Sequence, residues 1–94
     1  MSDLPEPLPS RAVTFELLAD AEPGLLARVV VPFARRDLTP DRLRASRHGD
    51  SIRVQVALDA MPAELVDGVE GNLRQIVGVR RVEVAWRARL RAVS

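Results

Sequence analysis

Apolar residues recur along this chain with two different periods, and the period changes several times between residues 13 and 86. Residues 13–18, 51–58 and 81–86 alternate apolar and polar side chains, as half-buried strands do. Residues 23–36 and 62–77 instead repeat their apolar side chains every three or four positions, as on one face of a helix. Residues 43–46 form a weaker alternating segment. The pattern predicts the order strand, helix, strand, strand, helix, strand.

This order predicts an α+β fold, a ferredoxin-like βαββαβ sandwich with both helices on one face of a four-stranded antiparallel sheet. Right-handed crossovers place the first and third strands in the centre and the other two at the edges. The predicted core consists of the apolar faces of these elements: Phe15, Leu17, Leu26, Val30, Phe33, Val54, Val56, Leu65, Val69, Leu73, Val82 and Val84.

Proline and glycine mark the boundaries of these elements. Gly49 and Asp50 predict a two-residue hairpin loop, which places His48 opposite Ser51, Ala45 opposite Val54 and Leu43 opposite Val56. Asp59 and Pro62 indicate the start of the second helix, and Gly78 its end. Pro32 interrupts the first helix and predicts a bend between Arg28 and Pro32.

The turn at residues 20–24 joins the first strand to the first helix. We expect Pro23 in the first helical turn, where its missing N–H costs nothing. Gly24 then allows the backbone amides at this helix start to approach a small anion closely. The turn is therefore the strongest candidate for a binding site in the sequence.

The chain divides into three expected segments. Pro5, Pro7 and Pro9 make residues 1–11 a leader without regular structure, residues 12–87 form the folded domain, and residues 88–94 form a basic tail. The leader has neither the basic start nor the apolar centre of a targeting signal, and no apolar run is long enough for a membrane span. A cytoplasmic location is the default expectation, with no membrane partner.

Composition argues against several kinds of chemistry. The chain has no cysteine and one histidine, so thiolate nucleophiles and thiolate metal sites are excluded, and no acidic cluster has metal-ligand spacing. The 14 basic residues are all arginine and nearly balance 13 acidic ones, unlike a general nucleic-acid binder. The expected protein is not an enzyme and uses no cofactor and no metal.

Two features have alternative interpretations. Arg42, Arg44, Arg47 and Arg53 lie on adjacent predicted strands and form either an anion-binding patch or a charged edge that discourages aggregation. His48 is either a pH-sensitive contact or a solvated turn residue. The sheet face offers no aromatic platform for RNA bases, because Phe15 faces the helices and the third strand has no aromatic residue.

Three runs resemble the ACT domain, and more narrowly the short regulatory subunit of acetolactate synthase. They are residues 15–28 (FELLADAEPGLLAR), 33–36 (FARR) and 75–82 (QIVGVRRV). The similarity extends over residues 13–86. In two places the chain departs from the family, which commonly has asparagine at the position of Ala21 and a glycine-aromatic-asparagine segment at the position of Asp37-Leu38-Thr39.

The resemblance implies a regulatory module that binds an amino acid between two protomers and acts on a catalytic subunit that uses thiamine diphosphate. It implies branched-chain amino acids as effectors and a homodimer formed through the second strand and the first helix. The effector-binding residues that it implies are Glu22, Pro23, Gly24 and Leu25 of one protomer with Leu38 and Thr39 of the other. Two other functions stay open: a stand-alone ACT-like interaction dimer without an effector, and an enzyme that depends on His48 or Glu22.

Overall fold

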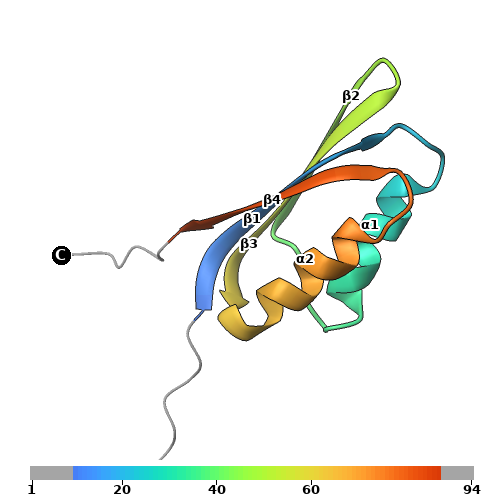
Figure 1. Cartoon of the computed structure of the whole chain (residues 1–94). Helices are drawn as coiled ribbons and strands as arrows, with labels where there is room; N and C mark the ends of the chain where they lie inside the picture. The colour runs from blue at the N-terminus through green and yellow to red at the C-terminus, as the bar shows by residue number, and fades with distance from the viewer. Residues whose placement is uncertain (1–9, 88–94) are drawn as a thin grey trace, which may run out of the picture.

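The computed structural model describes residues 10–87, which form one antiparallel sheet and a layer of helices (Figure 1). The elements follow in the order β1 (Ser10–Asp20), α1 (Leu25–Ala34), β2 (Arg42–His48), β3 (Ser51–Pro62), a short 3-10 helix (Ala63–Leu65), α2 (Val66–Arg74) and β4 (Val79–Arg87). The strand order is β2-β3-β1-β4. The predicted βαββαβ order, central strands and edge strands are all confirmed.

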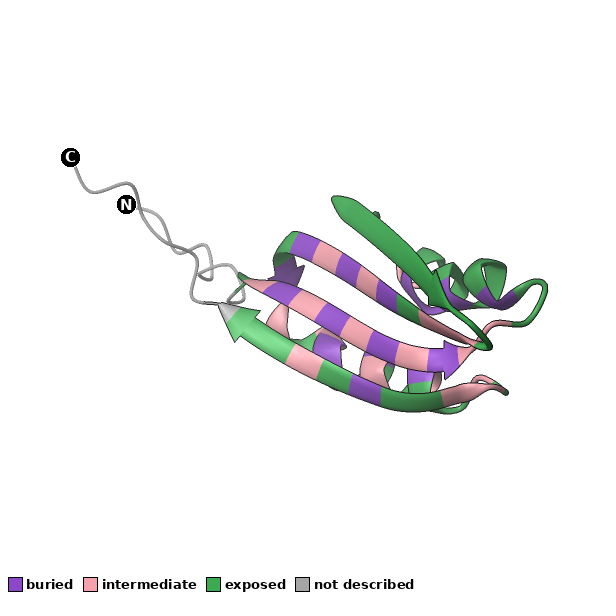
Figure 2. Cartoon of the chain, turned by 90° about the horizontal axis from the view of Figure 1, so that it is seen from above, coloured by how far each residue is buried: buried purple, intermediate pink, exposed green. Residues whose placement is uncertain are grey.

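Both helices lie on the same face of the sheet, and the other face is open (Figure 2). Val13, Phe15, Leu17 and Ala19 of β1 are buried under the helices, while the residues between them are half-buried on the open face. The ring of Phe15 meets that of Phe33 edge-on, with centroids 5.3 Å apart. This contact joins the central strand to α1, as the alternation of β1 predicted.

The β2–β3 hairpin has the predicted register. His48 pairs with Ser51, Ala45 with Val54 and Leu43 with Val56. Gly49 begins the turn with φ +60°, a conformation that glycine adopts without strain. The two-residue loop therefore fixes which side chains of β2 face the helix side of the sheet.

The core differs from the predicted one mainly along α1. Leu25, Val29, Pro32 and Phe33 are the buried residues of this helix. Leu26 and Val30 were predicted in the core, but each is 38% exposed. The prediction was wrong because the apolar stripe of this helix, which also includes Leu26 and Val30, is wider than the surface that the sheet covers. The remaining core residues that it omitted are Val13, Ala19, Leu58, Met61 and Val66.

Several boundaries also differ from the predicted ones. β3 continues through Asp59 to Pro62, so these residues end a strand and do not start the helix. β3 extends this far because Ser10 and Arg11 of β1 pair with Pro62 and Met61. Ser10 and Arg11 therefore belong to β1 and not to the expected leader. Residues 1–9 and the expected tail at 88–94 lie outside the described residues.

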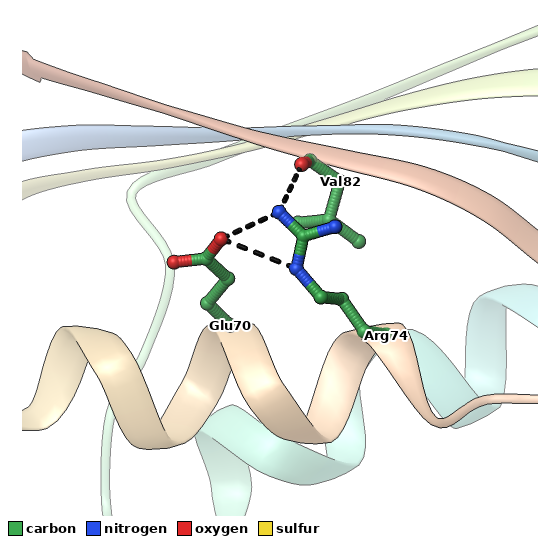
Figure 3. A network of polar contacts seen from close by, with 3 residues as sticks. All are labelled: Glu70, Arg74 and Val82. Atoms are coloured by element: carbon green, nitrogen blue, oxygen red, sulfur yellow. Dashed lines mark hydrogen bonds and ion pairs between the residues drawn. The ribbon is translucent and has the colours of Figure 1, made fainter.

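Arg74 connects α2 to the edge strand β4 (Figure 3). Its Nη2 donates a hydrogen bond of 2.8 Å to the carbonyl oxygen of Val82 and one of 2.6 Å to Glu70 Oε2. Its Nε donates a third bond to the same carboxylate oxygen at 3.2 Å. One carbonyl of β4 is thus already occupied, whereas β2, the other edge strand, is exposed at every residue (Figure 2).

Candidate functional site

Three turns meet at the end of the sheet where β1 finishes. The backbone N–H of Asp20 donates to the carbonyl of Gly78 in the α2–β4 turn at 2.8 Å. The N–H of the next residue, Ala21, donates to the carbonyl of Asp50 in the β2–β3 hairpin, also at 2.8 Å. The position of the β1–α1 turn is therefore fixed by two turns that are distant in sequence.

Gly24 shapes the start of α1. It is the N-cap residue and has φ +82°, in the left-handed region that favours glycine. The N–H of Leu25 donates to the carbonyl of Glu22 at 3.2 Å, so this amide is used within the turn. The amides of Leu26 and Ala27 follow in the first helical turn, where no helix carbonyl precedes them.

Pro23 lies outside the helix, contrary to the prediction that placed it in the first helical turn. The helix begins at Leu25, after the left-handed residue Gly24. A residue with positive φ cannot continue a right-handed helix, so the helix cannot include the proline before it. Pro23 is part of the turn, and the exposed residue Gly24 directly precedes the helix.

A hollow of about 290 Å³ lies beside this turn, and the hairpin forms its other wall. Arg47 of β2 and Ile52 of β3 line it together with the turn and the first residues of α1, Ala21, Glu22, Pro23, Gly24, Leu25, Leu26 and Ala27. Arg47 Nε donates to the carbonyl of Gly49 at 3.0 Å, which holds the side chain near the hairpin tip.

Arg47 was missed as a site residue, because the sequence grouped it with Arg42, Arg44 and Arg53. Alternation along β2 separates them: Leu43, Ala45 and Arg47 share one face, and Arg42 and Arg44 share the other. The signal was present in the predicted hairpin register, which already placed Leu43 and Ala45 toward the helices. Arg47 follows them by the same period of two.

Charges of both signs border the hollow. The Glu22 carboxylate lies against Gly78, with Oε2 3.3 Å from the position that a Cβ would take there. Gly78 has φ +97°, which a glycine adopts without strain. Its lack of a side chain also leaves space for the Glu22 carboxylate. Arg47 and the start of α1, with its partial positive charge, line the same hollow. The arrangement suits a small ligand that carries a negative and a positive group.

Leu38 and Thr39 do not join this cluster within one chain. They follow the far end of α1, and a helix of 10 residues is about 15 Å long. Leu38 packs against the core and its N–H donates to the carbonyl of Phe33 at 2.9 Å, while Thr39 is exposed. The structure brings together Glu22, Pro23, Gly24 and Leu25 and leaves the other two predicted residues at the opposite end of the helix.

Arg42 differs from the other arginines of β2 because its partner is a carboxylate. Its Nη2 lies 2.8 Å from Asp59 Oδ1, and the hydrogen bond to that carboxylate, with its charge, raises the pKa of Arg42. Within residues 10–87, no three histidine, aspartate or glutamate residues lie close enough to hold a metal ion. No helix in that range is long and apolar enough to cross a membrane.

The fold and the hollow beside its first turn define a small α+β domain of the ferredoxin-like class. The ACT-like domain family matches residues 9–91, which is most of the chain, and the protein belongs to this family. ACT domains are regulatory, non-catalytic modules that generally bind a small molecule. A search of the curated proteins found no match.

Solved structures support the same fold. The ACT domain of the GTP pyrophosphokinase of Chlorobium tepidum is similar with a TM-score of 0.70 and 10% identity, over 81% of this chain and 99% of that one. A homoserine dehydrogenase from Thiobacillus denitrificans is similar with a TM-score of 0.72 and 17% identity over 92% of this chain, which spans 20% of the dehydrogenase. The C-terminal domain of MgtC from Mycobacterium tuberculosis is similar with a TM-score of 0.67 and 15% identity, over 95% of this chain and 100% of that one.

Proposed function

We propose that this chain is a regulatory subunit that binds a free α-amino acid at the hollow beside Gly24 and modulates a partner enzyme. The observation that carries the proposal is the pair of opposite charges, Glu22 and Arg47, that line the hollow. Arg47 and the amides at the start of α1 suit the ligand carboxylate, because both favour an anion. Glu22 suits the ligand ammonium group.

A second copy of the chain completes this site. β2 is an edge strand whose residues are all exposed, and β4 has a carbonyl already occupied by Arg74. We expect two copies to pair through β2 in antiparallel fashion around a two-fold axis. Leu26 and Val30 would then be covered on the adjoining face of α1, which explains why two large apolar side chains are exposed there.

The charges on β2 favour a register with Ala45 on the two-fold axis over one with Arg44 there. With Ala45 on the axis, Arg47 lies opposite Leu43 of the second copy, and Arg44 lies opposite its Ser46. With Arg44 on the axis, two guanidinium groups would face each other, which is destabilising. The favoured register also brings the hairpin tip of one copy close to the start of β2 in the other, and Leu38 and Thr39 precede that strand. Both predicted halves of the site would then meet.

Ligand analogues test the amino-acid site. We expect saturable binding of valine, leucine or isoleucine by calorimetry, with weak binding of the corresponding 2-keto acid and of the amino-acid amide. Glu22→Gln should reduce the preference over the keto acid, and Arg47→Gln the preference over the amide. Absence of binding by every amino acid would favour the alternative function, a stand-alone ACT-like homodimeric interaction module without an effector.

Sedimentation tests the dimer independently. Leu26→Asp and Val30→Asp should shift the protein from dimer to monomer while the circular dichroism spectrum is retained. Val77→Asp is the matched control, because Val77 is 75% exposed and lies in the α2–β4 turn, away from the proposed interface. A wild-type protein that is monomeric at high concentration would contradict the dimer.

The partner enzyme that we propose is acetolactate synthase, on the resemblance of residues 15–28, 33–36 and 75–82 to its short regulatory subunit. The partner would be the large, thiamine diphosphate-dependent catalytic subunit. Affinity purification of the tagged chain from its native cells should recover that subunit. Recovery of a different enzyme would retain the regulatory function and reject this assignment.

A further inference from the structure

The open face of the sheet carries two arginines without partners on neighbouring strands. In the β2–β3 ladder, Arg44 lies opposite Gln55 and Ser46 lies opposite Arg53. Arg44 and Arg53 are therefore diagonal neighbours on the face away from the helices, within reach of long side chains. Both are exposed, and neither guanidinium forms a hydrogen bond or an ion pair with another residue of 10–87.

Other polar groups lie next to these arginines. Ser46 Oγ is 3.1 Å from His48 Nε2, and both residues share the open face with Arg44. A hollow of about 450 Å³ is lined by Arg44, Ala45, Ser46, Arg53 and Gln55. Two guanidinium groups, a hydroxyl and an imidazole are the groups that proteins use to bind phosphate oxygens.

The surroundings limit the size of the anion. Gln55 Nε2 of β3 donates to Glu16 Oε2 of β1 at 2.5 Å. On β4, the Glu83 carboxylate lies 4.0 Å from the Arg81 guanidinium. These carboxylates border the two arginines on the side toward β1 and β4, and Leu18 separates Arg53 from Arg81, the next cation along the face. Among the described residues, Phe15 and Phe33 are buried on the helix side and Trp86 pairs with Val13 on that side, so no ring on this face can stack a base.

We propose that Arg44 and Arg53, with Ser46 and His48, bind the phosphate group of a small phosphorylated compound on the open face. The site lies on the opposite face of the sheet from the hollow beside Gly24. It does not depend on the proposed amino-acid site or on the partner enzyme. Binding at one can therefore be measured while the other is absent.

The test is a titration of the full chain with inorganic phosphate and with a phosphate monoester, phosphoserine, against sodium chloride at equal ionic strength. Amide NMR signals of residues 44–53 should shift in a saturable way. Arg44→Gln and Arg53→Gln should each weaken binding at least tenfold, and Arg53→Lys less, because lysine keeps the charge but not the fork of donors. Arg35→Gln, which removes an exposed charge at the end of α1, should have no effect.

Tighter binding of phosphoserine than of phosphate indicates an ester ligand, and equal binding indicates the free anion; both support the site. Equal shifts with sodium chloride, or equal weakening by Arg35→Gln, would overturn it. A uridine oligonucleotide or an acidic peptide that binds more tightly than phosphate, with the same arginine dependence, would also overturn the small-ligand assignment. Amino-acid binding by Arg44→Gln and Arg53→Gln should stay at the wild-type level, which separates the two proposals.

Discussion

Phe33 of α1 meets Phe15 of β1 at an interplanar angle of 80°, and neither ring is accessible to solvent. The edge-on contact is a favoured arrangement of two aromatic rings, and both rings belong to the core cluster of residues 10–87. It holds the helix that begins at Leu25 against the strand that ends at Asp20. The geometry of the candidate site therefore depends on how Phe15 and Phe33 pack in the core.

Truncation of Phe33 should be the most costly of the substitutions proposed for stability. Phe33→Ala removes a fully buried ring, and we expect a loss of about 3–5 kcal/mol in the free energy of unfolding. Val31→Ala on the exposed side of the same helix should change it by less than about 0.5 kcal/mol. Urea denaturation measures both, and equal losses would contradict the assigned orientation of α1.

Gly24 should resist substitution for backbone reasons alone. No atom lies within 4 Å of the position that a Cβ would take, so the cost comes only from φ +82°. Gly24→Ala should lose about 1–2 kcal/mol, and Gly24→Asn less, because asparagine tolerates the left-handed region. Thermal unfolding of the two variants measures the order, and a larger loss for asparagine would disprove this explanation.

The two glycines of α2 should respond differently to alanine. A Cβ at Gly71 meets no atom within 4 Å, so Gly71→Ala should stabilise the protein by about 1 kcal/mol. A Cβ at Gly68 would lie 2.9 Å from Arg36 Nη2, and that guanidinium also bonds to the carbonyl of Pro32. Gly68→Ala should therefore gain less. An equal rise in melting temperature for both variants would show that Arg36 moves away freely.

Arg74 should contribute more to stability than its partner Glu70. Arg74→Ala breaks the bond to the Val82 carbonyl as well as the ion pair, and we expect a loss of about 1 kcal/mol. Glu70→Ala breaks only a surface pair four residues apart, worth about 0.3–0.5 kcal/mol. The loss from Glu70→Ala should disappear in 1 M salt, and that from Arg74→Ala should persist in part. Denaturation at two salt concentrations makes the comparison.

Local pattern was sufficient for much of this fold. The period of two in β1 and β3 and the glycine at position 49 determined the strand faces and the hairpin register, because both are properties of short segments. The same alternation contained the correct face for Arg47, although the chemical grouping of arginines concealed it. Half of the candidate site, Glu22 to Leu25, is likewise contiguous in sequence and was predicted from it.

Other features depend on contacts between segments that are distant in sequence, and only the tertiary structure decided them. Which half of the α1 stripe is buried depends on how much of the helix the sheet covers, and so Leu26 and Val30 are exposed where the sequence predicted core. The extension of β3 to Pro62 depends on its pairing with Ser10 and Arg11 of β1. The charges around the hollow come from Glu22 and Arg47, 25 positions apart, and the hydrogen bond from Ala21 of the β1–α1 turn to Asp50 of the hairpin brings the two segments together. The sequence by itself determined the elements and their faces, because period and turn chemistry are local, and the tertiary structure alone decided which faces stay open and which charges become neighbours.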